Sequence, residues 1–325
     1  MGFFERMYYG KAGKRDYSEQ DMPKTRVSLF FRVLKDHFFD LVKVNLLQLI
    51  FWIPFLFWTY INFAAIQAID VQALTQAGGG YSELTAQING YLFMWLLGLI
   101  PCVAITGPSS AGAAYIMRNW ARDQHAFLLS DFKDAFKSNW KQALVISVIT
   151  AFVPALAYTA VSYYGAMATQ NFVMFVPMVV VVCLAILWTI MLPLLYPMMI
   201  GYELRLKDLI KNALLMGCAR LPHMVLARLI TVLPIVLVFV AVYIGNALML
   251  MLISMYYMFF GFALSRLVYA SIANGVFDRY LNPHIEGAQV RMGLRPQDLD
   301  DLPLDDDEDE EDEDEAYESD EDDDE

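Results

Sequence analysis

The sequence predicts an all-α, polytopic membrane protein: a bundle of six spanning helices, amphipathic helices at the cytoplasmic surface, and a disordered acidic C-terminal tail. Three observations predict it. Hydrophobic residues make up 58% of the 325 positions, and the mean hydropathy of +0.42 exceeds that of soluble domains. Several apolar runs are long enough to cross about 30 Å of hydrocarbon as helices. Finally, Lys and Arg are confined to a few places between these runs.

The charge of the chain is divided very unevenly along its length. Of 36 acidic residues, 21 lie between Asp298 and Glu325, so the rest carries 15 acids against 23 Lys and Arg. A run of acids buries no apolar area and repels itself, which predicts a disordered tail over residues 281–325. The tail either serves solubility alone or attracts cations or a basic partner.

The N-terminal residues 1–43 are predicted to form a cytoplasmic segment that contains an interfacial helix. From Thr25 to Lys43, apolar residues recur at intervals of three and four with basic residues between them. This pattern is typical of a helix lying in the membrane surface, although it also fits the start of the first span. The segment has no short apolar core followed by a small-residue cleavage site, so we expect no cleaved signal peptide.

The predicted membrane domain, residues 44–280, contains six apolar runs. The first carries Trp52, Trp58 and Pro54, and the apolar stretch at 229–260 is too long for one ordinary span. Gly245 and Asn246 near its middle divide it into two. The predicted spans are 44–65, 91–117, 143–164, 172–200, 229–244 and 247–268.

The positions of the basic residues predict the orientation of these spans. Nine Lys and Arg precede the first span, five lie in 118–141, five in 205–228, and four at or beyond Arg266. The other connections hold none. Six spans with both termini in the cytoplasm place every positive charge inside, which predicts a multi-pass protein of the cell membrane. A five-span alternative makes 229–268 one long or re-entrant element and puts the tail outside.

Motifs for chemistry are not found in the sequence. No ionisable side chain lies in the middle of a predicted span, where one usually marks an ion-coupled carrier. No nucleotide-binding, hydrolase or metalloprotease pattern occurs, and Cys102, Cys183 and Cys218 lack metal-site spacing. We therefore expect no enzyme activity, no catalytic, cofactor or metal site, and no nucleic-acid partner; the lipid bilayer is the expected environment.

One span contains an unusual run of small residues around a proline. Pro108 removes a backbone donor, so the segment could open as a kinked helix beside a solute path. Small residues at spacing four also allow another helix to approach closely, and this packing interpretation is favoured. The candidate packing or pathway residues are Gly107, Pro108, Ser109, Ser110, Ala111 and Gly112.

Two amphipathic stretches, Ser130–Lys141 and Lys207–Arg220, are predicted to lie at the cytoplasmic surface. Anchoring in the interface suits their Trp, Lys and Arg content, and docking of a partner is a further possibility. The candidate contact residues are Asp131, Phe132, Phe136, Trp140, Lys141, Lys207, Asp208 and Lys211.

Several segments resemble the YesL-like membrane proteins of Gram-positive bacteria, a family of unknown function. The segments are Lys43–Leu47, Gly107–Tyr115, Asp131–Gln142, Phe260–Leu264 and Val276–Tyr280. The resemblance covers about Arg26 to Tyr280, and the acidic tail and the loop at 69–90 lie outside its pattern. It implies an integral membrane protein without established activity, often encoded beside sugar ABC importers, and it supplies no catalytic residues.

Three hypotheses about function follow. The preferred one is an accessory or assembly factor for carbohydrate ABC import, with importer subunits as partners. The alternative is a channel or facilitator for a small neutral solute, which needs a polar path near Ser109 and Ser110. The third is a structural or signalling membrane protein with neither partner nor flux.

Overall fold

The computed structural model describes residues 22–69 and 80–296. The first 21 residues, residues 70–79 of the loop after the first span, and the acidic tail from residue 297 lie outside the described residues. All regular elements in the described part are helical, which confirms the predicted all-α class. The helices form one compact unit, Thr25–Leu294.

Six helical segments in the described residues are long and apolar enough to cross a membrane, as predicted. The chain is thus a multi-pass membrane protein. The last segment is made of two α-helices joined by one π-helical turn, Tyr257–Gly261. The six are α3 (Phe38–Gln67), α5 (Tyr81–Ala104), α7 (Leu128–Ala168), α8 (Phe175–Gly201, after the 3₁₀ turn Phe172–Met174), α10 (Leu221–Tyr243), and α11 (Ala247–Tyr256) continued by α12 (Phe262–Tyr280).

Three shorter helices accompany these segments. α2 (Arg26–Asp36) begins at Thr25, whose side chain accepts a hydrogen bond from the Ser28 backbone N–H at 3.1 Å. This is the N-cap interaction that Thr commonly makes. α6 (Thr106–Trp120) follows α5 after a break at Ile105, and α9 (Leu206–Ala219) connects α8 to α10. A 3₁₀ turn, Asn282–His284, follows α12.

The helix boundaries differ from the predicted spans. α3, α5 and α10 begin at Phe38, Tyr81 and Leu221, before the predicted starts at 44, 91 and 229. The predicted span 91–117 crosses the break at Ile105, so it comprises the end of α5 and most of α6. The amphipathic stretch at 130–141 and the third span form one continuous helix, α7, of 41 residues. The sixth segment continues beyond residue 268 to Tyr280, which places Arg266 in the first half of α12.

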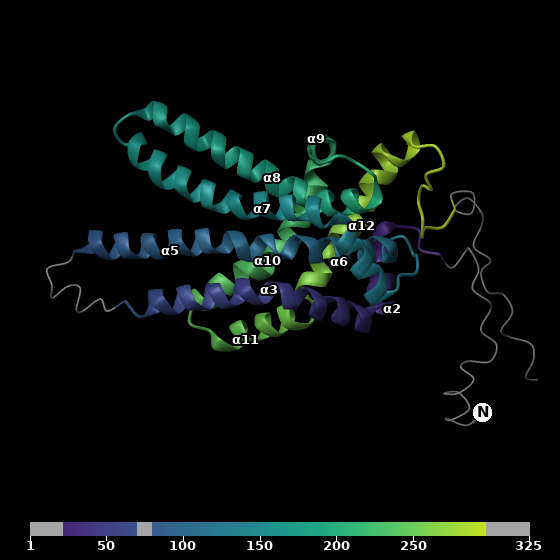
Figure 1. The fold of residues 1–325 in the computed structure, drawn as a ribbon, viewed down its shortest axis with the longest axis horizontal. Helices are drawn as coiled ribbons and strands as arrows, with labels where there is room; N and C mark the ends of the chain where they lie inside the picture. The colour runs from purple at the N-terminus through teal and green to yellow at the C-terminus, as the bar shows by residue number, and fades with distance from the viewer. Residues whose placement is uncertain (1–21, 70–79, 297–325) are drawn as a thin grey trace, which may run out of the picture. The chain divides into compact units, whose positions relative to one another are not determined.

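The long helices α3, α5, α7 and α8 pack as neighbours in that order (Figure 1). On α3, Trp58 donates from Nε1 to the backbone carbonyl of Trp95 at 3.0 Å. Trp95 in turn donates to the hydroxyl of Thr59 at 3.1 Å. A Cβ at Gly98 would lie 2.2 Å from the Trp58 indole, so the glycine lets α3 and α5 approach closely.

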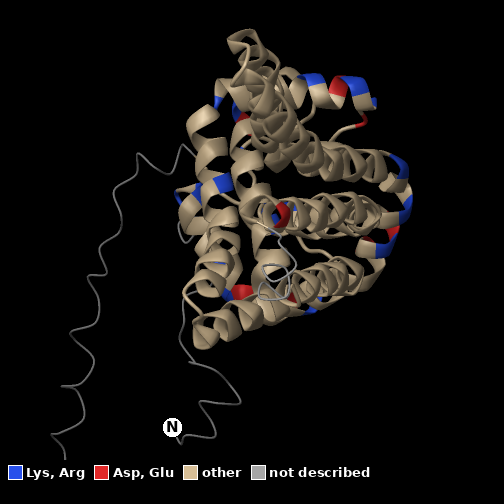
Figure 2. Cartoon of the chain, turned by 90° about the vertical axis from the view of Figure 1, so that its left-hand side faces the viewer, with Lys and Arg blue, Asp and Glu red and all other residues tan. Residues whose placement is uncertain are grey.

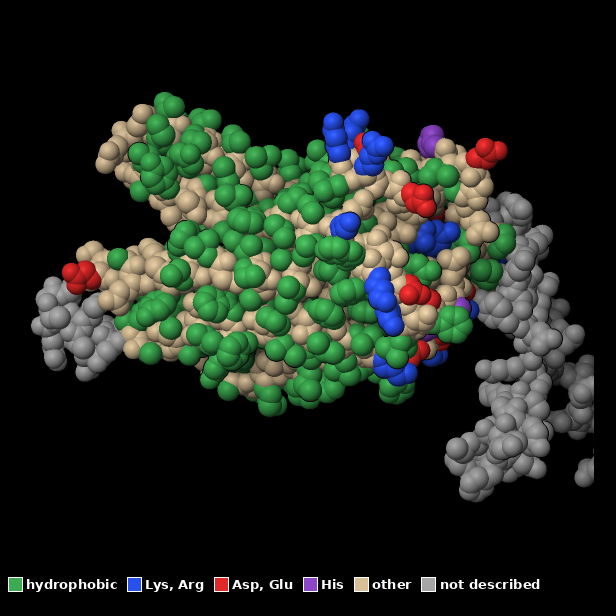
Figure 3. All heavy atoms as spheres, in the orientation of Figure 1, with side chains coloured by type: hydrophobic (Ala, Val, Ile, Leu, Met, Phe, Trp, Pro, Cys, Tyr) green, Lys and Arg blue, Asp and Glu red, His purple; other side chains and the backbone are tan. Residues whose placement is uncertain are grey.

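The charged residues gather at one end of this helical unit. Figure 3 shows hydrophobic side chains over most of the face drawn, with Lys and Arg toward one end. Viewed from the other end (Figure 2), most of the ribbon carries no charge. We call this the basic end: it comprises α2, α9, the C-terminal turn of α6 and the first turns of α7. There His37 stacks on Trp120 at 4.5 Å, and Gly201 packs against the Arg118 guanidinium.

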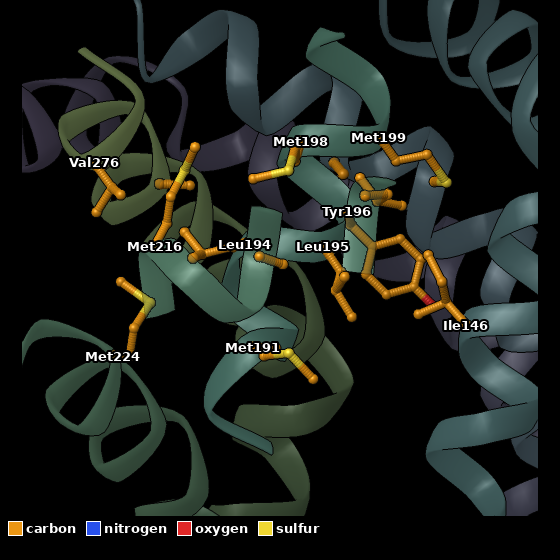
Figure 4. Packing of buried hydrophobic residues seen from close by; sticks show 14 of the residues in the cluster. Ile146, Met191, Leu194, Leu195, Tyr196, Met198, Met199, Met216, Met224 and Val276 are labelled. Atoms are coloured by element: carbon orange, nitrogen blue, oxygen red, sulfur yellow. The ribbon is translucent and has the colours of Figure 1, made fainter. Parts of the chain in front are cut away.

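Two buried clusters hold the helices together. The larger one, shown in Figure 4, joins α8 and α9 to α7, α10 and α12. It is rich in methionine, whose unbranched side chain fills irregular gaps between helices. The residues labelled there are Ile146, Met191, Leu194, Leu195, Tyr196, Met198, Met199, Met216, Met224 and Val276.

The second cluster explains the position of α2. Leu29 and Val33 on one face of α2 are buried in a cluster with Trp120 of α6 and Leu267 of α12. Val27 and Phe31 on the opposite side are 66% and 62% exposed. The helix therefore packs one apolar face on the protein and leaves a second apolar surface outside, as expected for a helix beside a lipid surface.

Candidate functional site

The small-residue segment predicted from the sequence lies in α6, and every one of its six residues is buried. A Cβ at Gly107 would lie 2.4 Å from the backbone oxygen of Ala143 in α7. At Gly112 it would lie 2.8 Å from the backbone oxygen of Phe132, also in α7. These residues therefore form a close contact between α6 and α7, of the kind that small residues allow in membrane bundles.

Pro108 lies in the first turn of α6, close to the end of α5. Proline lacks the backbone N–H that would bond the carbonyl of Ala104. The helix is interrupted at Ile105, three residues before Pro108. The hydroxyl of Ser147 in α7 donates to this Ala104 carbonyl at 2.7 Å. The freed backbone acceptor is thus satisfied by the neighbouring helix.

Ser109 and Ser110 are the residues on which the solute-path hypothesis depends. Both are fully buried, and both hydroxyls donate to the Thr106 carbonyl, at 2.9 and 2.8 Å. Ser110 also accepts from the Arg266 guanidinium at 2.7 Å. The two hydroxyls serve contacts within the protein, and nothing in this geometry favours a path beside them.

The predicted contact residues at the start of α7 take two different roles. The Asp131 carboxylate accepts from the Phe127 backbone N–H at 2.8 Å, which caps the first turn of α7. Phe132 is buried against α6, and Phe136 packs on Phe51 of α3 with ring centroids 5.6 Å apart. These two aromatic side chains belong to the interior rather than to a free surface.

Trp140 and Lys141, the next predicted contact residues, line an open groove of about 780 Å³ at the basic end. The opposite wall is the connection between α8 and α9, including Glu203 and Arg205. Gln142 fixes the two walls by donating to the Leu204 carbonyl at 3.0 Å. Trp140 is 46% exposed. The groove thus presents an indole, two cations and one carboxylate to its surroundings.

The remaining predicted contact residues, Lys207, Asp208 and Lys211, are exposed on α9. They follow Arg205 directly in the chain but do not line the groove. On the buried side of the same helix, Leu209 and Ala213 pack in the larger cluster. α9 is therefore amphipathic, with its charged face free.

Asn45 was not identified as a site residue from the sequence, yet it holds the π-helical turn in place. It is fully buried in α3, and its amide nitrogen donates to the carbonyls of Tyr257 and Met258 at 3.0 and 2.8 Å. Its amide oxygen accepts from the backbone N–H groups of Phe262 and Ala263 at 2.9 and 3.1 Å. One side chain thus bonds four backbone groups where the α-helical ladder is interrupted.

A second network that the sequence analysis missed surrounds Asp278 of α12. Its carboxylate forms an ion pair with Arg26 of α2 and accepts from the Asn282 amide at 2.7 Å and the Arg291 backbone N–H at 3.2 Å. Asn282 accepts from the Tyr202 hydroxyl at 2.5 Å. Burial lowers the pKa of Arg26 and its pairing with Asp278 raises it, with a net lowering. Asp278 therefore connects the N-terminal helix α2 to α12 and to the chain that follows it.

The described residues contain no group of three or more His, Cys, Asp or Glu that could hold a metal ion. Cys102, Cys183 and Cys218 are free thiols. In the described part of the chain, the arrangements that stand out are the packed small-residue contact, the groove at the basic end, and the buried polar contacts of α3, α6 and α12.

Comparison with known proteins adds a match over the middle of the chain. Residues 86–161 match the family model described as "Protein of unknown function, DUF624". The match spans most of α5, all of α6 and most of α7, so it includes the small-residue contact and the Trp140 wall of the groove. The searches of curated proteins and of solved structures gave no match.

Proposed function

We propose that this protein is a non-enzymatic accessory or assembly factor for a carbohydrate ABC importer in the cell membrane. The observation that carries the proposal is the groove at the basic end, with Trp140 and Lys141 on one wall and Arg205 on the other. Tryptophan and arginine are enriched among the residues that contribute most to the binding energy of protein–protein interfaces. The class of partner comes from the resemblance to the YesL-like proteins.

The proposed partner is the cytoplasmic part of an importer subunit. The groove suits a segment that offers an apolar side chain to the indole and a carboxylate to Lys141 and Arg205. Lys207 and Lys211 of α9 are exposed and follow Arg205 in the chain, so they add positive charge to the basic end. The contact is expected to weaken with salt, because part of it is electrostatic.

Copurification tests this proposal. The tagged chain is coexpressed with the subunits of a carbohydrate importer, extracted in mild detergent, and the recovered subunits are quantified. Trp140→Ala combined with Lys141→Glu should lower recovery at least about tenfold. Lys133→Glu, a charge reversal at an exposed α7 position outside the groove, is the matched control and should leave recovery unchanged. A wild-type chain that recovers no importer subunit would overturn the proposal, as would equal recovery by the groove variant.

The proposal also needs the basic end to face the cytoplasm, with both termini inside. Its support is the placement of all 23 Lys and Arg on one side of a six-span arrangement. A reporter fused after Glu325 should be inaccessible from the medium in intact cells. Labelling of that reporter from outside would refute this orientation and, with it, a cytoplasmic partner.

A further inference from the structure

Two arginines from neighbouring helices, Arg228 of α10 and Arg266 of α12, lie within one polar cluster. Arg228 donates to the Tyr269 hydroxyl at 2.6 Å, and that hydroxyl is 2.8 Å from the Thr231 hydroxyl. Arg266 donates to the Ser110 hydroxyl at 2.7 Å and lies over the Tyr196 ring, 4.7 Å from its centroid. Four helices, α6, α8, α10 and α12, thus contribute to the cluster.

The cluster holds two positive charges and no acid. None of the ion pairs among the described residues involves Arg228 or Arg266. The groups that act electrostatically on Arg266 are two tyrosines and Arg228, and Arg228 acts unfavourably. Two half-buried cations that repel one another are costly unless an anion joins them.

Most hydrogen-bond donors of the two guanidiniums are unused. Each guanidinium offers five N–H donors, and each makes one hydrogen bond within the described protein. The Nε atoms of Arg118 and Arg122 are buried and have no hydrogen-bond partner. No nitrogen of Arg228 or Arg266 is in that situation. The unused donors of Arg228 and Arg266 therefore keep some accessible surface, with Arg266 on the inner side of the cluster against the buried Ser110 and Tyr196.

The depth of the cluster is set by Ser110. On α6, Gly107 faces Ala143 of α7 and Gly112 faces Phe132, so Ser110 lies level with residues 132–143 of α7. This part of α7 carries exposed Lys133, Lys137 and Lys141 and the half-exposed Trp140. Lys and Trp at one level mark the zone of lipid headgroups. The two arginines accordingly lie at headgroup depth.

The surface around Arg228 is apolar and exposed. Val225 and Ile235 share its side of α10, three residues before and seven residues after it, and they are 37% and 45% exposed. Such side chains belong against acyl chains in a membrane protein. A ligand that reaches Arg228 from this side has an acyl-chain surface next to its charged group.

We propose that Arg228 and Arg266 bind the phosphate of an anionic phospholipid headgroup, whose acyl chains lie along the exposed face of α10. The planar fork of Arg matches phosphate oxygens in pairs, and the Tyr269 hydroxyl holds the Arg228 guanidinium in place by accepting a hydrogen bond from it. Basic pockets between membrane helices at the cytoplasmic side are suited to such headgroups. This site is separate from the groove and does not depend on an importer partner.

Binding is tested on the full chain in detergent micelles with phosphatidylglycerol, phosphatidylcholine or inorganic phosphate added. Phosphatidylglycerol should raise the apparent melting temperature, and native mass spectrometry should show the lipid retained. Arg228→Gln should weaken this binding about fivefold, and Arg228→Gln with Arg266→Gln should weaken it further. Lys137→Gln, which removes an exposed charge at the same depth, is the matched control and should bind as the wild type does.

If the double variant fails to fold, the single variant Arg228→Gln still tests the site, because the contact between the Tyr269 and Thr231 hydroxyls remains in it. Arg228→Lys, which keeps the charge and loses the fork, should also bind more weakly. Equal retention of phosphatidylglycerol by the wild type and Arg228→Gln would overturn the site. A melting shift with inorganic phosphate as large as that with phosphatidylglycerol would overturn the lipid as its ligand, as would an equal response to phosphatidylcholine.

Discussion

Replacing Asn45 with leucine should destabilise the protein strongly, although the two side chains have nearly the same size. The change removes four hydrogen bonds to the backbone around the π-helical turn. If only the N–H groups of Phe262 and Ala263 lose their partner, the cost at about 1–3 kcal/mol per group is several kcal/mol. Interhelical bonds in membranes average about 0.6 kcal/mol each, which gives a lower figure. We expect a loss of about 2–5 kcal/mol.

Gln48, one turn later on α3, supplies the matched control. It is also fully buried, but neither atom of its side-chain amide has a hydrogen-bond partner in the described protein. Gln48→Met removes a polar group that gains nothing from its position, so stability should stay the same or rise. The two substitutions therefore make opposite predictions for buried amides of the same helix.

Thermal unfolding in detergent, followed by the fluorescence of the six tryptophans, measures both variants. A free-energy loss of 1 kcal/mol lowers the melting temperature of a domain of this size by about 2–4 °C. Asn45→Leu should thus melt at least about 4 °C below the wild type, and Gln48→Met at or above it. An Asn45→Leu protein that melts with the wild type, or a Gln48→Met protein as weak as Asn45→Leu, would refute the role given to Asn45.

Three further substitutions test the packing and the polar contacts by the same melting assay. Gly107→Ala should lower the free energy of unfolding by about 2–4 kcal/mol, because the new Cβ meets backbone atoms of α7 that cannot move aside. Gly90→Ala is its control: no atom lies within 4 Å of the added Cβ, so this change should be neutral or slightly stabilising. Asp278→Asn should lower the free energy of unfolding by about 2–4 kcal/mol, because it leaves the largely buried Arg26 without its ion-pair partner. Asp40→Asn is its control: its partner Lys43 is 63% exposed, so stability should change by less than about 1 kcal/mol. Ser147→Ala should cost about 1–2 kcal/mol, since the freed carbonyl at the end of α5 loses its donor. If the two variants of a pair have the same melting temperature, the contact of Gly107 or of Asp278 is contradicted. If Ser147→Ala melts at the temperature of the wild type, the hydrogen bond of Ser147 is contradicted.

The number and type of long helices could be predicted from the sequence because both depend on local apolarity. A run of about 20 apolar residues has few alternatives to a spanning helix. The amphipathic character of α2 and α9 was equally visible, since it resides in the spacing of apolar and charged residues. The packing interpretation of Gly107 likewise needed only the spacing of small residues.

The residues at which helices end and begin could not be predicted in the same way: Pro108 indicates a kink in the sequence, but it does not indicate that α5 ends at Ala104. Apolarity continues through Ile105, so composition alone joins α5 to α6, and the bond that stabilises the break comes from Ser147, about 40 residues later. Conversely, no helix-breaking residue separates Trp140 from Ala143, so α7 passes from its amphipathic half into its apolar half without interruption. At Ile105 a helix boundary lies inside an apolar run, and between Trp140 and Ala143 the polarity changes inside a continuous helix. Helix boundaries therefore do not coincide with changes of polarity in this chain.

The sequence alone does not show which polar residues of this chain have a structural role and which have a functional one. Asn45 and Ser147 each bond backbone groups that a π-turn or a proline leaves open. Their presence is explained once the partner is known, and no ligand is needed. Arg228 and Arg266 differ, because their hydrogen bonds use a small part of their donors and their charges are left unopposed in the described protein. The packing of the described residues leaves these charges unopposed, and an anionic headgroup supplies the opposite charge that they lack.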